Sequence, residues 1–276
     1  MRDNAVSRMP FLKWILLLIL GTAFFGAIGY AVLWVGDLFQ DSKPVLAAIY
    51  AGAGVLMLFL YLLLSSLMEG RQVDELHPGG IFPGIFKGFG TAILLLAVPA
   101  GVLFACGMLD FGSISFDWEE LGFSFAFSFA VAVCVEIVFR GFLFRFLDQR
   151  WNFALGLLFS AIAFGALNYL RPGATIWSSV ALAIGSGFLL GAAFKYSGSL
   201  FFPIGITWMS CFILSFLSSA GISVTGNELL TGGDAGLDSS IITVAVCLVF
   251  ILIYLVKMKN SRHKEDKRII KPLWSR

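Results

Sequence analysis

The chain has 276 residues, of which 59% are hydrophobic and only 13% are charged. Its mean hydropathy of +0.91 is far above that of a soluble domain of ordinary composition, so the sequence predicts an integral membrane protein. The net charge of +2 gives no reason to expect a nucleic acid as partner.

Eight apolar segments predict transmembrane helices, because about 20 apolar residues cross a hydrocarbon core about 30 Å thick. In chain order they are 12–35, 45–67, 86–107, 121–147, 153–170, 176–194, 200–220 and 241–256. The first follows Arg2, Arg8 and Lys13, as the core of a signal peptide would, but its apolar run is too long and no small-residue cleavage site ends it. We expect a retained anchor and an all-α integral membrane protein of about eight helices.

The basic residues predict the orientation of these helices. If the eight helices alternate in direction, every Lys and Arg except Lys43, Arg140 and Arg171 falls on one side. Excess basic charge marks the cytoplasmic side, so both termini are expected there, in a multi-pass protein of the plasma (inner) membrane. The loops expected on the other side, FDWEELG (116–122) and TGNELLTGGDAGLDSS (225–240), are acidic or neutral.

No soluble domain or low-complexity linker interrupts the chain. The expected organisation is a two-helix membrane region at 1–64, a membrane domain at 65–257 and a basic cytoplasmic tail at 258–276. The tail either binds anionic lipid, at about 1 kcal/mol per basic residue near the surface, or only fixes the last helix by its charge.

Four cysteines lie singly in apolar runs, without a CxxC pair: Cys106, Cys134, Cys211 and Cys247. This spacing favours buried, reduced thiols over a metal site or a disulfide framework.

Glu136 and Arg140 stand within an apolar run, where ionisable side chains are costly and are candidates for function. Their spacing of four places both on one helix face, where they can pair. The pair has either a catalytic role or a structural one, in which each charge neutralises the other. Arg145 follows on the same helix near its expected cytoplasmic end, where its side chain can extend to the membrane surface.

Four segments carry a resemblance to a known family. They are VEIVFRGFLFRFLDQRW (135–151), SAIAFGALNYLRPGAT (160–175), LLGAAFKYSGSLFFPIGITWMSCF (189–212) and LLTGGDAGLDSS (229–240). Their order and spacing resemble the CPBP family of CAAX proteases and bacteriocin-processing (Abi-like) intramembrane metalloproteases. EGRQVDELHPGGIFPGIFKGFG (69–90) is similar to the lead-in of bacterial members, so the resemblance covers roughly 65–257.

The resemblance implies a type II CAAX prenyl endopeptidase-like helical core, and motifs of the form EExxxR, FxxxH and HxxxN. Their first Glu, two His and Asn line a cavity that opens to the membrane and the cytosolic side and activates water. In the first motif Arg140 and Glu136 match, but Val135 replaces the first Glu. In the second, Asn168 replaces His. In the third, Thr207 and Cys211 replace His and Asn.

These replacements predict a catalytically inactive relative, because neither an amide nor a hydroxyl is a base near neutral pH. The only histidines, His77 and His263, fall in expected cytoplasmic segments, and we expect neither a metal nor another cofactor. The expected partners are membrane lipid, another membrane protein or a prenylated or hydrophobic peptide, bound in a cavity lined by Glu136 and the replaced positions.

Three other functions stay open at this stage. The chain could be an active endopeptidase that uses Glu136, with Asn168 and Thr207 as oxyanion donors. Cys211 could be a nucleophile with Glu136 as its base, although the His that usually activates a thiol is missing. A transporter or channel would require a continuous polar path, which the sequence does not offer.

Overall fold

The computed structural model describes residues 9–39, 42–111, 117–171 and 173–270. In this part of the chain it confirms the predicted all-α membrane fold, since seven segments are long and apolar enough to cross a membrane. They are Phe11–Gly36, Lys43–Glu69, Pro78–Ala105, Trp118–Arg150, Ile176–Ser197, Phe201–Ser219 and Ile241–Asn260. The remaining predicted helix also forms, as Phe153–Asn168, but it has only 16 residues.

The long elements follow the predicted order. They are α2 (Phe11–Asp37), α3 (Lys43–Glu69), α4 (Ile81–Ala105), α5 (Trp118–Glu136), α6 (Arg145–Arg150), α7 (Phe153–Asn168), α8 (Ile176–Leu182), α9 (Phe188–Ser197), α10 (Phe201–Ser219) and α12 (Ile241–Ile270). Two π-helical segments, η3 (Ile137–Phe144) and η4 (Ala183–Gly187), join α5 to α6 and α8 to α9. The short elements are η1 (Asp74–Leu76), η2 (Pro78–Gly80), β1 (Leu109–Phe111), β2 (Ile222–Val224), α11 (Glu228–Thr231), η5 (Gly233–Ala235) and η6 (Leu237–Ser239).

Local sequence explains where several helices begin. The Asp117 carboxylate accepts hydrogen bonds from the backbone N–H groups of Glu119 and Glu120, which are otherwise unpaired at the start of α5. Thr175 and Ser178 form a capping box that starts α8. These caps lie at the ends of apolar runs, so the polar groups stand where each membrane segment starts.

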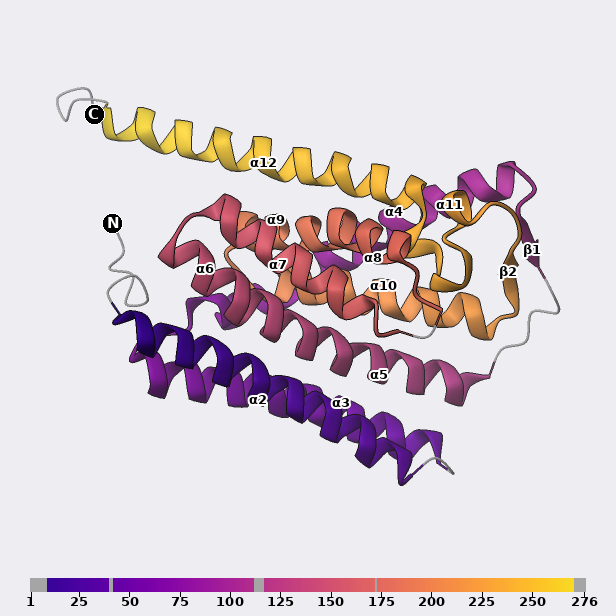
Figure 1. Ribbon diagram of the computed structural model, residues 1–276, viewed down its shortest axis with the longest axis horizontal. Coiled ribbons are helices and arrows are strands. Elements are labelled where there is room, and N and C mark those ends of the chain that lie inside the picture. Colours follow the sequence, from indigo (N-terminus) through magenta and orange to yellow (C-terminus); the bar gives the residue numbers. More distant parts are fainter. Residues whose placement is uncertain (1–8, 40–41, 112–116, 172, 271–276) are drawn as a thin grey trace.

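The helices form one elongated bundle (Figure 1). The beginning of α2 and the end of α12 lie at the same end of the bundle, and β1, β2 and α11 lie at the opposite end, here called the ribbon end. There β1 and β2 pair antiparallel, with Leu109 opposite Val224. The sequence did not predict this ribbon, because three-residue strands are too short to show an alternating pattern.

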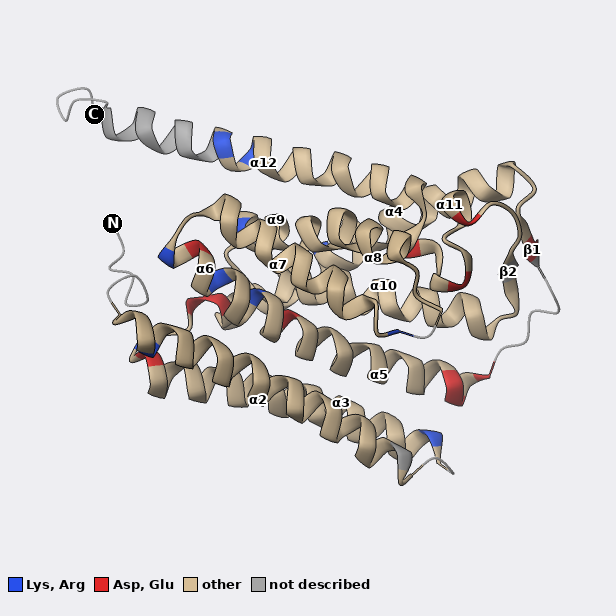
Figure 2. Ribbon diagram, in the orientation of Figure 1, with Lys and Arg blue, Asp and Glu red and all other residues tan. Residues whose placement is uncertain are grey.

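Charged residues are unevenly distributed over the bundle (Figure 2). Helix α12 continues to Ile270 instead of ending near 256, so the first part of the basic tail is helical, and residues 271–276 lie outside the described part. All four cysteines are free. The prediction that they are buried is confirmed for Cys247, whereas Cys134 and Cys211 are only partly buried. It was wrong for Cys106, which is exposed at the C-terminal cap of α4.

A buried ionic cluster, here called the clasp, joins the end of α3 to α6. Arg145 donates to both carboxylate oxygens of Glu69, at 2.7 and 2.6 Å, and Arg71 donates to Glu69 and Glu75. The Tyr61 hydroxyl donates to Glu75 at 2.7 Å. The expectation that Arg145 reaches the membrane surface was therefore wrong: its side chain is 5% exposed, because Glu69 binds it inside the bundle.

The clasp also changes the pKa of Glu75, which lies between two membrane-spanning segments. Burial opposes the ionisation of Glu75, but the hydrogen bond from Arg71 and the nearby guanidinium charges outweigh it and lower the pKa of Glu75 to about 2. The Glu75 carbonyl also accepts from the Leu200 N–H at 2.9 Å. The clasp therefore fixes the connection between α3 and α4 against two later parts of the chain.

Candidate functional site

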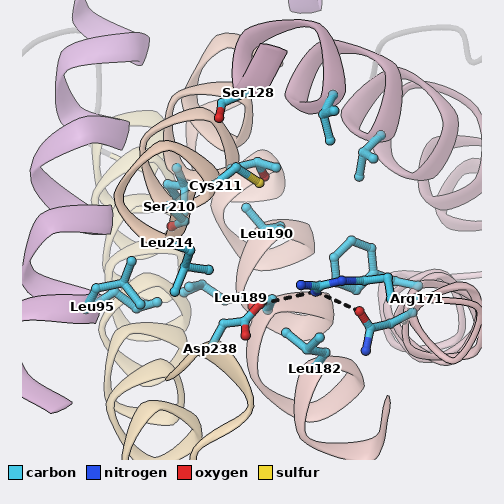
Figure 3. Close-up of a pocket in the computed structure, with 18 of the residues that line it drawn as sticks. Leu95, Ser128, Arg171, Leu182, Leu189, Leu190, Ser210, Cys211, Leu214 and Asp238 are labelled. Carbon is cyan, nitrogen blue, oxygen red and sulfur yellow. Dashed lines mark hydrogen bonds and ion pairs between the residues drawn. The ribbon is translucent and has the colours of Figure 1, made fainter. Parts of the chain in front are cut away.

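Four of the predicted site residues lie together in one cavity, here called the central pocket. Val135 comes from α5, Asn168 from the end of α7, and Thr207 and Cys211 from α10. The cavity has a volume of about 390 Å³. Its remaining lining is mostly leucine and phenylalanine: Leu95, Leu96, Phe127, Ser128, Val131, Phe164, Leu167, Arg171, Leu182, Ser186, Leu189, Leu190, Ile206, Ser210, Leu214, Ser215 and Asp238 (Figure 3).

Glu136 and Arg140, the two matching motif residues, do not line this pocket. Both are completely buried. The Thr207 hydroxyl donates a hydrogen bond of 2.6 Å to Glu136 Oε1, and Thr207 itself faces the pocket. Glu136 therefore lies behind Thr207, one position along α5 from the pocket-lining Val135, and Thr207 separates its carboxylate from anything in the cavity.

Arg140 holds the two π-helical segments together. It belongs to η3, and its Nη2 donates to the carbonyl oxygens of Ser186 and Gly187, at 3.5 and 3.3 Å, where η4 ends. A π-helical turn shifts the backbone pairing and leaves carbonyl groups available for such contacts. Arg140 Nε also lies 3.4 Å from Glu136 Oε2, and its guanidinium stacks 4.9 Å from the centre of the Phe164 ring. These contacts give the ion pair a structural role between α5, α7 and η4.

The residues present do not fit the metal ion that the family resemblance suggests. The pocket offers one thiol, one amide and one hydroxyl at the motif positions, from Cys211, Asn168 and Thr207. Zinc is held by His, Cys and carboxylate ligands, typically at least three of them from the protein. Within the described ranges, no group of three or more His, Cys, Asp and Glu side chains is arranged to hold a metal ion. At the motif positions this cavity therefore offers neither a zinc-ligand set nor a histidine.

Two charged residues stand at one end of the central pocket, and the sequence did not place them in the site. Figure 3 shows Arg171 and Asp238 pointing toward one another. Arg171 Nη1 donates to Asn168 Oδ1 at 2.9 Å and lies 3.5 Å from Asp238 Oδ2. Burial raises the pKa of Asp238, while Arg171 opposes that shift. One signal was available: Arg171 is one of only two basic residues on the side predicted to be acidic or neutral.

The central pocket continues into a larger hollow at the ribbon end, here called the vestibule. They share Phe127, Arg171, Leu214, Ser215 and Asp238, and the vestibule is also lined by Glu120, Glu228 and Asp234. The resemblance implied a cavity that opens to the membrane and the cytosolic side. Here the vestibule lies at the end of the bundle away from the beginning of α2 and the end of α12.

A second hollow borders the central pocket on its other side. This α2 groove has a volume of about 480 Å³ and is lined by α2, α3, α5, η3 and α7. It shares Val131, Val135 and Leu167 with the central pocket. Glycines keep α2 close to α5 here, since a Cβ on Gly29 would lie 2.6 Å from the sulfur of Cys134. Val135, which stands where the resembled motif has its first Glu, is therefore part of the wall between the two hollows.

Comparison with known proteins gave one family. Residues 117–213 match the family described as Type II CAAX prenyl endopeptidase Rce1-like. This range includes α5, η3, α7 and most of α10, which carry all six predicted site positions. No curated protein and no solved structure matched the chain.

Proposed function

We propose that this chain, which through residues 117–213 belongs to the type II CAAX prenyl endopeptidase Rce1-like family, is a non-catalytic member whose central pocket binds a hydrophobic ligand. One observation carries the proposal: the positions that would be catalytic line a single pocket and hold Val135, Asn168, Thr207 and Cys211. The scaffold keeps the cavity while the groups for proton transfer are replaced.

The pocket supports binding by its shape and lining. Its volume lies in the range of small-molecule sites, and such sites combine apolar walls with a few polar groups that orient the ligand. A hydrophobic molecule from the bilayer or a lipidated peptide fits this description. In a non-catalytic member, binding would regulate a membrane partner or report the presence of the ligand.

The competing function, an endopeptidase that uses Glu136 as its base, has less support. The carboxylate is fully buried, pairs with Arg140 and accepts from Thr207, so it does not face the pocket. A general base must come within about 3 Å of the proton that it removes, directly or through one water. To reach a substrate in the pocket, Glu136 would have to break its hydrogen bond with Thr207 and its ion pair with Arg140.

We propose a bacterial plasma membrane as the location, with both termini in the cytoplasm. The support is the distribution of charge: most Lys and Arg drawn in Figure 2 lie toward the end of the bundle where α2 begins, and the ribbon end carries mainly Asp and Glu. In this orientation the vestibule faces away from the cytoplasm.

The test is an assay of cleavage by the purified full chain, against peptides with and without an isoprenyl group. We expect no cleavage above the background set by Glu136→Gln. Glu119→Gln, which changes an exposed carboxylate at the start of α5, is the matched control. Cleavage that Glu136→Gln abolishes and Glu119→Gln preserves would overturn the non-catalytic function.

A further inference from the structure

Arg171 and Asp238, at the mouth of the central pocket, each have side-chain atoms without a hydrogen-bond partner among the described residues. Asp238 Oδ1 is buried without a hydrogen-bond partner. Arg171, whose side chain is 53% exposed, donates only through Nη1 to residues in the described ranges. Its closest approach to Asp238 is 3.5 Å, which is long for a charge-assisted hydrogen bond. One unpaired carboxylate oxygen and two unused guanidinium nitrogens therefore stand side by side.

We propose that Arg171 and Asp238 bind the zwitterionic head of a single-chain or diacyl membrane lipid, with one hydrocarbon chain in the central pocket. Arg171 would bind the phosphate and Asp238 the ammonium group. The inference rests on the proposed ligand-binding function and names its ligand class. A guanidinium is suited to bidentate phosphate recognition, and a buried carboxylate oxygen without a donor is suited to an ammonium.

The surrounding charges favour a head that carries both signs. A purely anionic head would meet Asp238 together with Glu228 and Asp234, which line the vestibule. A purely cationic head would meet Arg171 at the mouth. A zwitterion presents a complementary charge to each residue, and its ammonium group extends toward the acidic vestibule.

The hollows place the rest of such a lipid. Beyond Arg171 the central pocket is walled by Leu182, Leu189 and Leu190, which suit a hydrocarbon chain. The buried Ser128 Oγ, which has no hydrogen-bond partner, is one of the few polar atoms on that path. Val131, Val135 and Leu167 form the wall between the pocket and the α2 groove. All three are apolar, so this wall also suits a hydrocarbon chain in the pocket.

Three of the four cysteines allow the binding to be measured by alkylation. Cys211 lines the central pocket, Cys106 is exposed and Cys247 is buried, so variants that each keep only one of them report pocket occupancy, reagent activity and folding. The full chain in dodecyl maltoside is alkylated with N-ethylmaleimide in the presence of dodecylphosphoethanolamine, dodecyl phosphate or dodecylammonium. These probes share one chain length and differ in the charge of the head.

Dodecylphosphoethanolamine, whose primary ammonium can donate to Asp238, is expected to slow Cys211 alkylation at lower concentration than the other two probes. It should neither change the rate at Cys106 nor expose Cys247. Arg171→Gln and Asp238→Asn should each raise the half-protecting concentration about tenfold. Their matched control is Lys43→Gln with Asp117→Asn, which removes an ion pair of 2.8 Å at the same end of the bundle but outside the pocket.

Two outcomes would overturn the inference. Equal protection by all three probes in the unmodified pocket would exclude selection of the head and leave the hydrophobic-ligand function standing. If no probe protects Cys211, both the lipid inference and ligand binding by the pocket are wrong. Neither outcome depends on peptide cleavage, so the non-catalytic function is judged separately.

Discussion

Thr207 donates a hydrogen bond of 2.6 Å to Glu136 across the contact between α10 and α5, and both residues occupy positions of the family motifs. Thr207, which stands where the resembled motif has a His, thus supplies a hydrogen-bond donor to one oxygen of the Glu136 carboxylate. Inside the bundle this bond is strong, since its acceptor is a buried acid without access to solvent. The Thr207 hydroxyl therefore ties α10 to α5 at the buried ion pair.

The first prediction tests this stabilising role. Thr207→Val should lower the free energy of unfolding by about 2 kcal/mol, because Glu136 loses its hydrogen-bond donor in a buried site. Thr207→Ser should cost less, since it keeps the hydroxyl. Thr22→Val is the control, because the Thr22 hydroxyl only donates to carbonyl oxygens of its own helix. Equal losses for the two Thr207 variants, measured by unfolding in mixed micelles, would contradict the prediction.

The second prediction concerns the buried ion pair. Arg140→Met should lower the free energy of unfolding by about 3–5 kcal/mol, because it leaves Glu136 without its counter-charge and removes the contacts to Ser186 and Gly187. Glu136→Gln combined with Arg140→Met should cost clearly less than the sum of the two single changes. A double-mutant cycle measures the difference, and strictly additive losses would show that the pair is not coupled.

Much of the helical framework could be predicted because a membrane segment is defined by its own length and apolarity. The predicted segment 45–67 lies within α3, and the predicted 200–220 ends one residue beyond α10. The π-helical interruptions could not be predicted in this way. They depend on tertiary contacts, such as that of Arg140 with carbonyl groups 46 and 47 residues away.

In the candidate site, too, some residues could be predicted from the sequence and others depend on tertiary contacts. Motif spacing identified Val135, Asn168, Thr207 and Cys211, which the structure brings into one cavity. It did not identify Asp238, because its role depends on how η6 packs against α4, α8 and α12. Arg145 was misplaced for the same reason, since its partner Glu69 is 76 residues away in the chain.

The third prediction uses the clasp and pH. The pKa of Glu75 falls from 4.5 to about 2 on folding, so its ionised form stabilises the fold at neutral pH by about 3 kcal/mol. This contribution is complete above about pH 4.5 and is lost as pH falls toward 2. Glu75→Gln should therefore be less stable than the original chain at pH 7, and the difference should shrink as pH approaches 3.

Unfolding measured between pH 7 and pH 3 tests the role of the clasp. Glu119→Gln, at an exposed carboxylate, is the control and should change stability by less than about 0.5 kcal/mol at each pH. If Glu75→Gln lowers stability by the same amount at every pH, the effect comes from packing and not from the ionised carboxylate.

The last prediction concerns the close approach of α4 and α10. A Cβ added to Gly88 would lie 2.6 Å from the backbone oxygen of Phe202, so Gly88→Ala forces the two helices apart. The expected loss is about 1–3 kcal/mol. Gly90, two positions along the same helix, has no atom within 4 Å of its added Cβ. Gly90→Ala should be neutral or slightly stabilising, because alanine forms helix better than glycine.

The pair of variants separates packing from helix propensity, since both make the same chemical change within α4. Unfolding of each variant in mixed micelles gives the comparison. Gly205 provides a check from the other helix, because its added Cβ would lie 2.7 Å from the backbone oxygen of Ile85, and Gly205→Ala should cost about as much as Gly88→Ala. If Gly88→Ala and Gly90→Ala are equally stable, the backbones of α4 and α10 do not pack this closely.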